Sequence, residues 1–357
     1  MPLMNTSHWR GCALMLFGLL LFTGCGEPTK KIVLLINTED AFWNAARAGV
    51  KEAATDLKFG DAKYEAYVDS NVGQAKSQIE KLTSYLARKD IVAVGISPYD
   101  AKNDGVAEAL KKLKDKGVVI ICFDSDLPAE KHNLRDFYIG TNNIKAGKVL
   151  GTAAVNLKPE GAEYVQFVGT DAQQNAIERM DGFTSALNDK FTQKERMLDG
   201  GKRETAKSNV TSAITKYKDV SLLVGIWAYN GPAIADIIKD DRDKYTGVTF
   251  DADEAAVDHL DKGNLDAMLV QNPFMMGYLT VKAAYAKLNK DEATIKELFP
   301  KLGEPGGDIR DTGLKLIVPV KGSPLKAEQF KDVDPELEFM LLPAFQDWLK
   351  KYKLKSS

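Results

Sequence analysis

The feature of this sequence that most constrains its fold is a repeated alternation of short apolar runs with segments whose apolar residues recur at helical spacing. Residues 31–54 show the unit clearly. The run Ile32 to Ile36 is typical of a strand buried on both faces, and small and apolar residues from Ala45 to Ala53 follow at helical spacing. Strands that alternate with helices in this way predict an α/β fold built on a doubly wound parallel sheet.

The alternation continues in two successive series, which predict two lobes of the same architecture. In the first series we expect further strands at 64–68, 91–96 and 118–123, and in the second at 164–168, 222–227, 247–250 and 267–270, with a late strand at 314–320. A chain of 357 residues is long enough for two domains that each have a core.

Polar residues stand where the strands of the first series end: Asn37 and Asp40, then Asp69, Ser97 and Asp124. Ligands of open α/β sheets bind outside the carboxyl ends of the strands, so these side chains are expected along one rim. Several hydrogen-bonding groups on one rim favour a ligand of the size of a polyol.

Two adjacent aromatic residues, Phe42 and Trp43, follow the first strand beside the carboxylate of Asp40. An aromatic ring next to a carboxylate suits a sugar, because a sugar has apolar C–H faces and a rim of hydroxyl groups. The alternative is that both rings are core residues of the first helix. From this stretch alone, a place in the core is the better interpretation for at least one of the two rings.

The first 24 residues have the features of a signal peptide: a basic flank is followed by an apolar run from Cys12 to Phe22, too short for a permanent membrane span. Small residues before Cys25 resemble a bacterial lipobox, in which the cysteine is lipidated, although Phe22 stands where that motif more often has Leu. An ordinary signal peptide is the alternative. With Cys25 acylated, Cys122 has no partner, so we expect no disulfide and a buried Cys122.

The bulk composition gives no reason to expect nucleic acid or an acidic lipid as a partner, because the formal net charge is only −2. Paired carboxylates also occur in glycosidases. The chain lacks G-x-S-x-G, H-E-x-x-H, a P-loop and C-x-x-C, however, and its mature part has only His132 and His259. We therefore expect no enzyme, no metal and no organic cofactor. A repressor of similar architecture would carry an N-terminal helix-turn-helix instead of a secretion signal.

In its ordered set of short motifs the chain resembles the periplasmic sugar-binding proteins of ABC transporters, of the ribose/galactose type with the type I periplasmic-binding fold. The resemblance runs from about Lys31 to Val320. Its most specific pieces are Asp40-Ala41-Phe42-Trp43, Ile96-Ser97-Pro98, Phe123-Asp124, the stretch Asn175 to Phe183, Tyr229-Asn230, Phe250-Asp251 and Gln271-Asn272-Pro273.

The resemblance implies a ligand site between the lobes, with the aromatic pair on the sugar ring and polar side chains on its hydroxyl groups. The residues it places there are Asp40, Phe42, Trp43, Ser97, Asp124, Ser125, Asp171, Asn175, Arg203, Asn230, Asp251 and Gln271. Asp124, Asn230, Asp251 and Gln271 match the hydroxyl ligands of the family directly.

The chain departs from ribose-binding members at both of their ligand-contacting arginines, which align with Ser125 and Ile177. Arg203 falls near a position that is often aromatic. These departures put ribose itself in doubt, and the candidates to replace the lost groups are Asp171, Gln173, Asn175 and Arg203. For Asp171 and Arg203, a solvated loop charge is an equal alternative. Arg179 is expected to be structural and paired with Asp181 or Glu178.

Together these inferences predict an extracytoplasmic, lipid-anchored monomer that captures a small sugar or polyol and delivers it to an ABC-transporter permease. The alternatives are a sensor that presents its ligand to a membrane receptor, and a binder of a nucleoside or an amino acid. We expect a first lobe of residues 31–140 plus 272–308 and a second of 141–271 plus 309–325. The three crossings lie near Gly140, near Gln271 and at 308–314. The remaining parts are a signal peptide (1–24), a tether (25–30) and a C-terminal extension (326–357).

Overall fold

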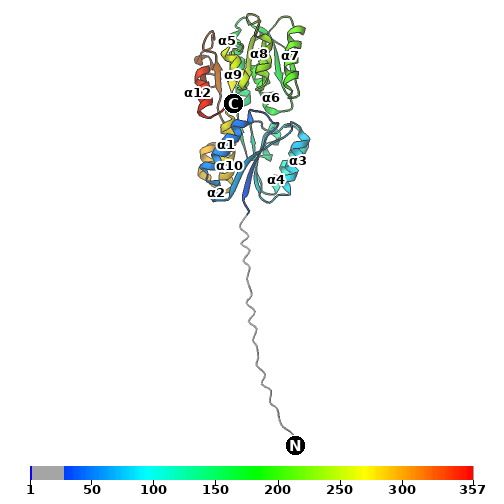
Figure 1. The fold of residues 1–357 in the computed structure, drawn as a ribbon, viewed down its shortest axis with the longest axis vertical. Helices are drawn as coiled ribbons and strands as arrows, with labels where there is room; N and C mark the ends of the chain where they lie inside the picture. The colour runs from blue at the N-terminus through cyan, green and yellow to red at the C-terminus, as the bar shows by residue number, and fades with distance from the viewer. Residues whose placement is uncertain (2–27, 357) are drawn as a thin grey trace.

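The computed structural model describes Met1 and residues 28–356 and shows two α/β lobes that follow one another along the long axis of the molecule (Figure 1). The expected fold class, two lobes built on largely parallel sheets, is confirmed. Nearly all of the predicted signal peptide, and Cys25, lie outside the described residues. In the part of the chain that the structure describes, no helix is both long and apolar enough to cross a membrane.

Within residues 28–356, the first lobe has a six-stranded sheet with the strand order β11-β5-β4-β3-β1-β2. Its strands are β1 (Lys30–Leu35), β2 (Tyr64–Asp69), β3 (Ile91–Ile96), β4 (Val119–Phe123), β5 (Phe137–Gly140) and β11 (Ile309–Asp311), and all of its neighbouring strands pair in parallel. One face carries the helices α1 (Trp43–Asp56), α2 (Phe59–Ala62), α10 (Pro273–Leu288) and α11 (Glu292–Leu298). The other face carries α3 (Ala75–Leu86) and α4 (Asp104–Asp115), with a short 3₁₀ helix, η1 (Ala129–Leu134), nearby.

The continuous apolar run of β1 follows from this double covering. Ile32 and Leu34 belong to the core under α1 and α10, while Val33 and Leu35 belong to the core under α3 and α4. Because successive side chains of a strand point to opposite faces, a strand covered on both faces needs apolar residues at every position.

The second lobe has a seven-stranded sheet within the described residues, in the order β13-β12-β10-β9-β8-β6-β7. Its strands are β6 (Ala162–Val168), β7 (Phe191–Leu198), β8 (Val220–Gly225), β9 (Thr246–Phe250), β10 (Ala267–Val270), β12 (Lys315–Val318) and β13 (Glu338–Leu341), and β12 runs antiparallel to β10. One core contains residues of α5 (Asn143–Leu157), α6 (Gln174–Ser185) and η2 (Ala327–Phe330). The other contains residues of α7 (Arg203–Lys216), α8 (Asn230–Ile238), α9 (Glu254–Asp261) and α12 (Leu342–Lys351).

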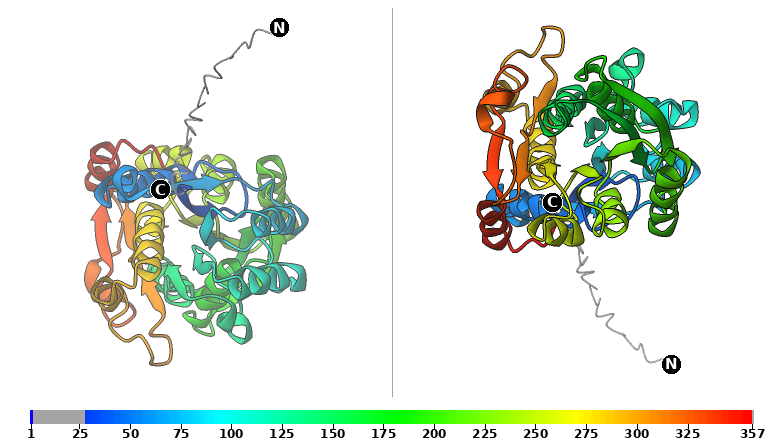
Figure 2. Two further views of the ribbon diagram at one scale, coloured as in Figure 1. Left: turned by 90° about the horizontal axis from the view of Figure 1, so that it is seen from below. Right: turned by 90° about the horizontal axis from the view of Figure 1, so that it is seen from above.

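The chain passes between the lobes after β5, after β10 and between β11 and β12, close to the expected crossings. Two boundaries differ from the expectation. Residues 309–311 pair with β5 and so belong to the first sheet, not to the second lobe. The expected C-terminal extension is part of the second lobe, because β13 pairs with β12 and Phe330 and Phe345 are buried in its cores. Figure 2 shows this segment, orange to red, along one side of the lobe.

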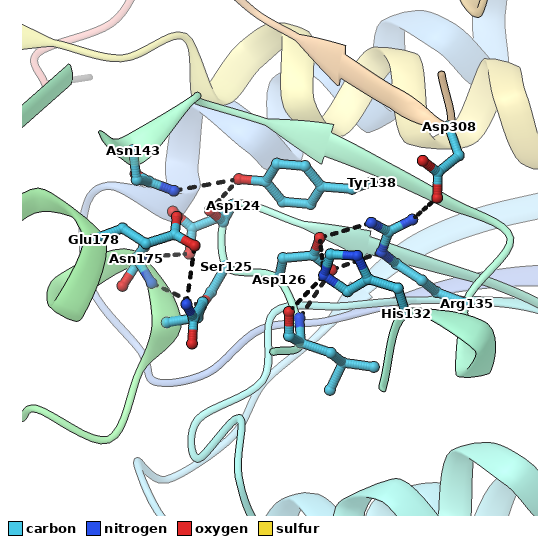
Figure 3. Close-up of polar contacts among 12 residues, drawn as sticks. Asp124, Ser125, Asp126, His132, Arg135, Tyr138, Asn143, Asn175, Glu178 and Asp308 are labelled. Atoms are coloured by element: carbon cyan, nitrogen blue, oxygen red, sulfur yellow. Dashed lines mark hydrogen bonds and ion pairs between the residues drawn. The ribbon is translucent and has the colours of Figure 1, made fainter. Parts of the chain in front are cut away.

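A buried ionic network holds the strand that leads into the third crossing (Figure 3). Arg135 donates two hydrogen bonds to the carboxylate of Asp126, at 2.7 and 2.8 Å, and a third to Asp308, the residue before β11. His132 Nε2 lies 3.3 Å from Asp126 as well. The guanidinium therefore ties the loop after β4 to the crossing segment.

Candidate functional site

A cavity of about 110 Å³ lies between the carboxyl ends of the two sheets. Of the twelve residues expected at the site, eight line it: Asp40, Phe42, Trp43, Asp124, Asn175, Arg203, Asp251 and Gln271. Hydrogen bonds join the two lobes beside the cavity, from Asn37 Nδ2 to Gln173 Oε1 at 3.0 Å and from Asn175 Nδ2 to Asp124 Oδ2 at 3.2 Å. The described conformation is thus closed around the cavity.

Two carboxylates with the same backbone conformation lie in the cavity wall, one from each lobe. Asp124 follows β4 and Asp251 follows β9, and each has a φ of 62°, in the left-handed region that Asp and Asn adopt more readily than most residues. Asp124 accepts hydrogen bonds from Ser97 Oγ (2.8 Å) and Asn175, while Asp251 accepts one from Gln271 Nε2 (2.7 Å). The sharp turn after each strand aims the carboxylate into the space between the lobes.

Burial raises the pKa of Asp251 to about 6, although the Arg179 guanidinium and the Gln271 amide act in the opposite direction. Burial also raises the pKa of Asp124. A buried carboxylate with a raised pKa is one whose charge lacks full solvation, so both groups gain from a ligand that donates hydrogen bonds to them.

The raised pKa of Asp251 predicts a pH dependence of stability. Between about pH 4, near the pKa of an unfolded Asp, and about pH 6, the folded protein holds a proton that the unfolded chain has lost. The free energy of unfolding is therefore expected to fall across this window as the pH rises, by at most about 1.4 kcal/mol per pH unit from this group. Urea titrations of the wild type and Asp251→Asn at several pH values check this. Stability curves that run parallel for the two proteins would contradict it.

Arg179 lies in the cavity wall and not on the helix surface, which corrects the expected pairing. Its side chain is 1% exposed, stacks over the Phe250 ring at 4.9 Å and places Nη1 3.5 Å from Asp251. Asp181 is bound instead by Arg196, at 2.7 Å. Residues one or two positions apart on a helix point in different directions, so neither Glu178 nor Asp181 shares the face of Arg179.

Two polar atoms of cavity-lining residues have no hydrogen-bond partner, although they are buried. They are the donor Nη2 of Arg179 and the acceptor Oδ1 of Asn175. A buried polar group without a partner is costly, and native proteins rarely keep one without a reason. A ligand that both accepts and donates hydrogen bonds would satisfy the two together.

The two expected aromatic residues both line the cavity but differ in burial. Trp43 is 2% exposed and belongs to the core of the first lobe, with its ring edge-on to Phe123 at 5.5 Å. Phe42 is only partly buried and meets Trp43 edge-to-face at 5.0 Å. Phe42 therefore offers more free surface to a ligand, and Trp43 supports it from behind.

Sequence reasoning missed two aromatic residues of the second lobe, Trp227 and Tyr229, which follow β8 and line the cavity. The signal was the same as for Phe42, an aromatic residue just after a buried strand. Gln173, one of the candidates to replace the lost arginines, also lines the cavity. Asn37 lines it too, although the sequence identifies Asn37 only as a polar strand end.

The four remaining expected residues do not line the cavity. Ser97 and Ser125 are fully buried beside Asp124, and Figure 3 shows Ser125 near Asn175. Asn230 is buried behind the wall, where its amide binds Trp227 N and Asp199 at 3.0 Å each. Asp171 is exposed.

Arg203 lies at the mouth of the cavity, with half of its side chain exposed. Its Nη2 is 2.9 Å from Asp253 of its own lobe and 3.5 Å from Asp40 of the other lobe. Arg203 is thus part of an ion-pair bridge across the cleft.

In the part of the chain that the structure describes, no group of three or more His, Cys, Asp or Glu residues is arranged to hold a metal ion. Cys122 is buried in the core of the first lobe, as expected.

Comparison with known proteins identifies related sequences along most of the chain. The sequence profile described as a periplasmic binding protein domain matches residues 32–292. The xylose/arabinose-binding protein XylF of Sulfolobus acidocaldarius is 21% identical over 281 residues, which cover 74% of this chain and 68% of that protein. The D-apiose import binding protein of Actinobacillus succinogenes is 26% identical over 151 residues, which cover 42% of this chain and 46% of that protein.

Solved structures of ABC-transporter solute-binding proteins share the fold. One from Agrobacterium vitis, with bound D-fucose, has a TM-score of 0.72 and 19% identity, and the match covers 84% of this chain and 98% of that one. Another from Burkholderia graminis, in complex with D-arabinose, has a TM-score of 0.70 and 20% identity, with 82% and 96% covered.

Proposed function

The chain belongs to the periplasmic binding protein family, and from that premise we propose that it captures one small sugar or polyol between its lobes and delivers it to an ABC-transporter permease. The observation that carries the proposal is the pair of unpartnered atoms in the closed cavity, Arg179 Nη2 and Asn175 Oδ1, beside two buried carboxylates. A hydroxyl group both donates and accepts hydrogen bonds, so a polyol can satisfy all four groups.

The size and the lining of the cavity support a single small sugar. Its volume of about 110 Å³ is well below the ~300–1,000 Å³ of pockets for drug-sized ligands. The partly exposed Phe42 ring covers an apolar face, and the carboxylates fix the orientation. The relatives whose names state a ligand bind xylose, arabinose or apiose, and the solved structures above hold D-fucose or D-arabinose.

Capture without chemical change fits both the family and the carboxylates. The Sulfolobus acidocaldarius relative is a sugar-binding protein, and the two solved structures are solute-binding proteins of ABC transporters. Asp124 and Asp251 are bound by Ser97, Asn175 and Gln271, which hold them as hydrogen-bond acceptors for a ligand. The protein thus captures the sugar on behalf of the permease. The permease recognises it in the conformation in which the two lobes are closed.

Periplasmic binding proteins work outside the cytoplasm, and we propose that this one is held at the membrane by a lipid on Cys25. The apolar run before Thr23-Gly24-Cys25 supports this assignment. Changing Cys25 to Ser is expected to move the protein from the membrane fraction to the soluble fraction, because one acyl-bearing residue supplies the anchor. Fractionation and mass spectrometry of the N-terminus check this. Continued acylation of Cys25→Ser would show that the lipid lies elsewhere.

Thermal melting of the chain from Gly26 onward, against pentoses, hexoses, polyols, nucleosides and amino acids, tests the proposed function. A ligand that binds only the folded state adds about 4 kcal/mol of stability at a thousandfold excess over Kd, a shift of several degrees. A rise with one class of sugar or polyol supports the proposal. A rise only with nucleosides or amino acids keeps the fold and overturns the sugar assignment, and no rise with any compound favours a sensor that acts with a protein partner.

A further inference from the structure

We propose that residues 352–356, the tail that follows α12, form a strap between the lobes that stabilises the closed conformation. The helix α12 belongs to the second lobe (Figure 1), and the tail leaves it toward the first lobe. The tail contacts the first lobe at Ala41 and Phe274, neither of which lines the cavity. The strap therefore acts on the closing of the lobes and not on the ligand itself.

The end of α12 fixes the tail to the second lobe and sets its direction. The backbone N–H of Lys353 donates to the carbonyl of Lys350 at 3.1 Å, and that of Leu354 donates to the carbonyl of Leu349 at 2.9 Å. Lys353 has a φ of 54°, in the left-handed region. These features form a Schellman motif, which ends a helix and turns the chain away from it. Leu349 and Leu354 pack against the same core of the second lobe, so the tail is anchored there.

From this anchor the tail reaches the first lobe at two points. The ring of Tyr352 lies 5.6 Å from the ring of Phe274, in the first turn of α10. The hydroxyl of Ser356 donates to the carbonyl of Ala41 at 3.4 Å, and Ser356 is only 9% exposed. Ala41 belongs to the loop between β1 and α1, and α10 packs on the first sheet beside α1. Both contacts therefore join the second lobe to the first.

The two sides of the cleft are held by different parts of the second lobe. On the side of α4, the carbonyl of Ala172 accepts a backbone hydrogen bond from Ala101 at 3.2 Å. On the side of α1, the loop between β1 and α1 is held by the tail at Ala41 and by Arg203 at Asp40. The Arg203 contact is 3.5 Å long and half exposed, and such ion pairs contribute little. The tail thus supplies much of what joins the lobes on this side.

The strap has a consequence for ligand affinity. Opening of the lobes must break the contacts of the tail with the first lobe, because the tail is anchored in the second. A contact that exists only in the closed conformation shifts the equilibrium between the open and the closed conformation by its own free energy. Loss of the strap therefore raises the open population without ligand, and it weakens every ligand that binds the closed conformation.

Two altered forms of the chain from Gly26 onward test the strap. Lys353→Pro cannot adopt the positive φ and lacks the N–H that bonds to Lys350, so it misdirects the tail while the other residues of the tail remain. Lys353→Gly is its matched control, because glycine adopts the left-handed region readily. The second altered form ends at Leu354, which keeps the anchor in the core and removes the contact of Ser356 with the first lobe.

Spin labels on the substitutions Lys76→Cys in α3 and Ser208→Cys in α7 report the distance between the lobes, since both positions are exposed and Cys122 is buried. Without ligand, double electron–electron resonance is expected to show longer distances in Lys353→Pro and in the shortened chain than in the wild type and Lys353→Gly. In titrations with D-arabinose, D-xylose and D-fucose, the sugar concentration for half-closure is expected to rise about threefold to tenfold in the same two forms.

An unshifted distance distribution without ligand in Lys353→Pro or in the shortened chain, or an equal shift in Lys353→Gly, would overturn the strap. This outcome leaves the sugar-binding function intact. If no compound of the melting panel stabilises the wild type, the proposed function fails instead, and the measurement without ligand still decides the role of the tail.

Discussion

Asp124→Asn is expected to weaken sugar binding by at least about a hundredfold. An ionised carboxylate in a closed cavity can accept two hydroxyl protons, and each hydrogen bond to a charged group contributes roughly 1.5–3 kcal/mol. The amide of Asn keeps one acceptor and presents a donor where a hydroxyl proton must be accepted. Since 1.4 kcal/mol is a factor of ten in affinity, the loss of two such bonds gives a hundredfold or more.

Asn is preferred to Ala for this test because of the backbone. Asp124 has a φ of 62°, a conformation that Asn tolerates and that strains most residues with a Cβ atom. The variant is expected to unfold at nearly the same temperature as the wild type without ligand, because the amide still accepts from Ser97 and removes a poorly solvated charge. Asp171→Asn is the matched control, since Asp171 is exposed and absent from the cavity wall. Equal affinities of Asp124→Asn and the control would remove Asp124 from the site.

The strands that the sequence predicted best are those covered on both faces, and the reason is physical. A strand such as β1 or β8 must be apolar at nearly every position, which leaves a continuous run in the sequence. Edge strands leave no such run. Residues 191–198, FTQKERML, form β7 at the edge of the second sheet with mostly half-buried side chains, and the sequence pattern did not identify them.

The short β11 was assigned to the wrong lobe for a related reason. Only three residues long, it is held by pairing with β5 and by the contact of Asp308 with Arg135, a residue 173 positions earlier. Contacts between residues so far apart leave no local pattern. The same limit applies to the C-terminal extension, whose apolar residues are buried against strands formed by earlier parts of the chain.

Residue types and strand ends located the rim of the site, but they did not determine which side chains face the cavity. Asp124 and Asp251 do so because both backbones turn into the left-handed region. Asn230 follows a strand as well, yet its amide is turned toward Asp199 and positions Trp227. These orientations depend on partners from other elements, which a single sequence does not reveal.

The ionic network of Arg135, Asp126 and Asp308 offers the largest expected effect on the free energy of unfolding. The Arg135 side chain is fully buried and neutralises Asp126, whose side chain is only 10% exposed, while it also binds Asp308. Removing one partner of a buried ion pair leaves a charge without compensation, which costs about 3–5 kcal/mol. An exposed pair such as Lys111 and Asp115, 2.7 Å apart on α4, contributes only about 0.3–0.5 kcal/mol.

Arg135→Met is therefore expected to lower the free energy of unfolding by about 3–5 kcal/mol, against less than about 0.5 kcal/mol for the control Lys111→Met. Urea titrations of the two variants measure the difference. Adding Asp126→Leu to Arg135→Met should restore part of the loss, because it removes the carboxylate left without its guanidinium. Hydrogen exchange should rise at residues 309–311, which lose the anchor that Asp308 provides. If Arg135→Met were no more destabilised than Lys111→Met, the network would not hold the third crossing.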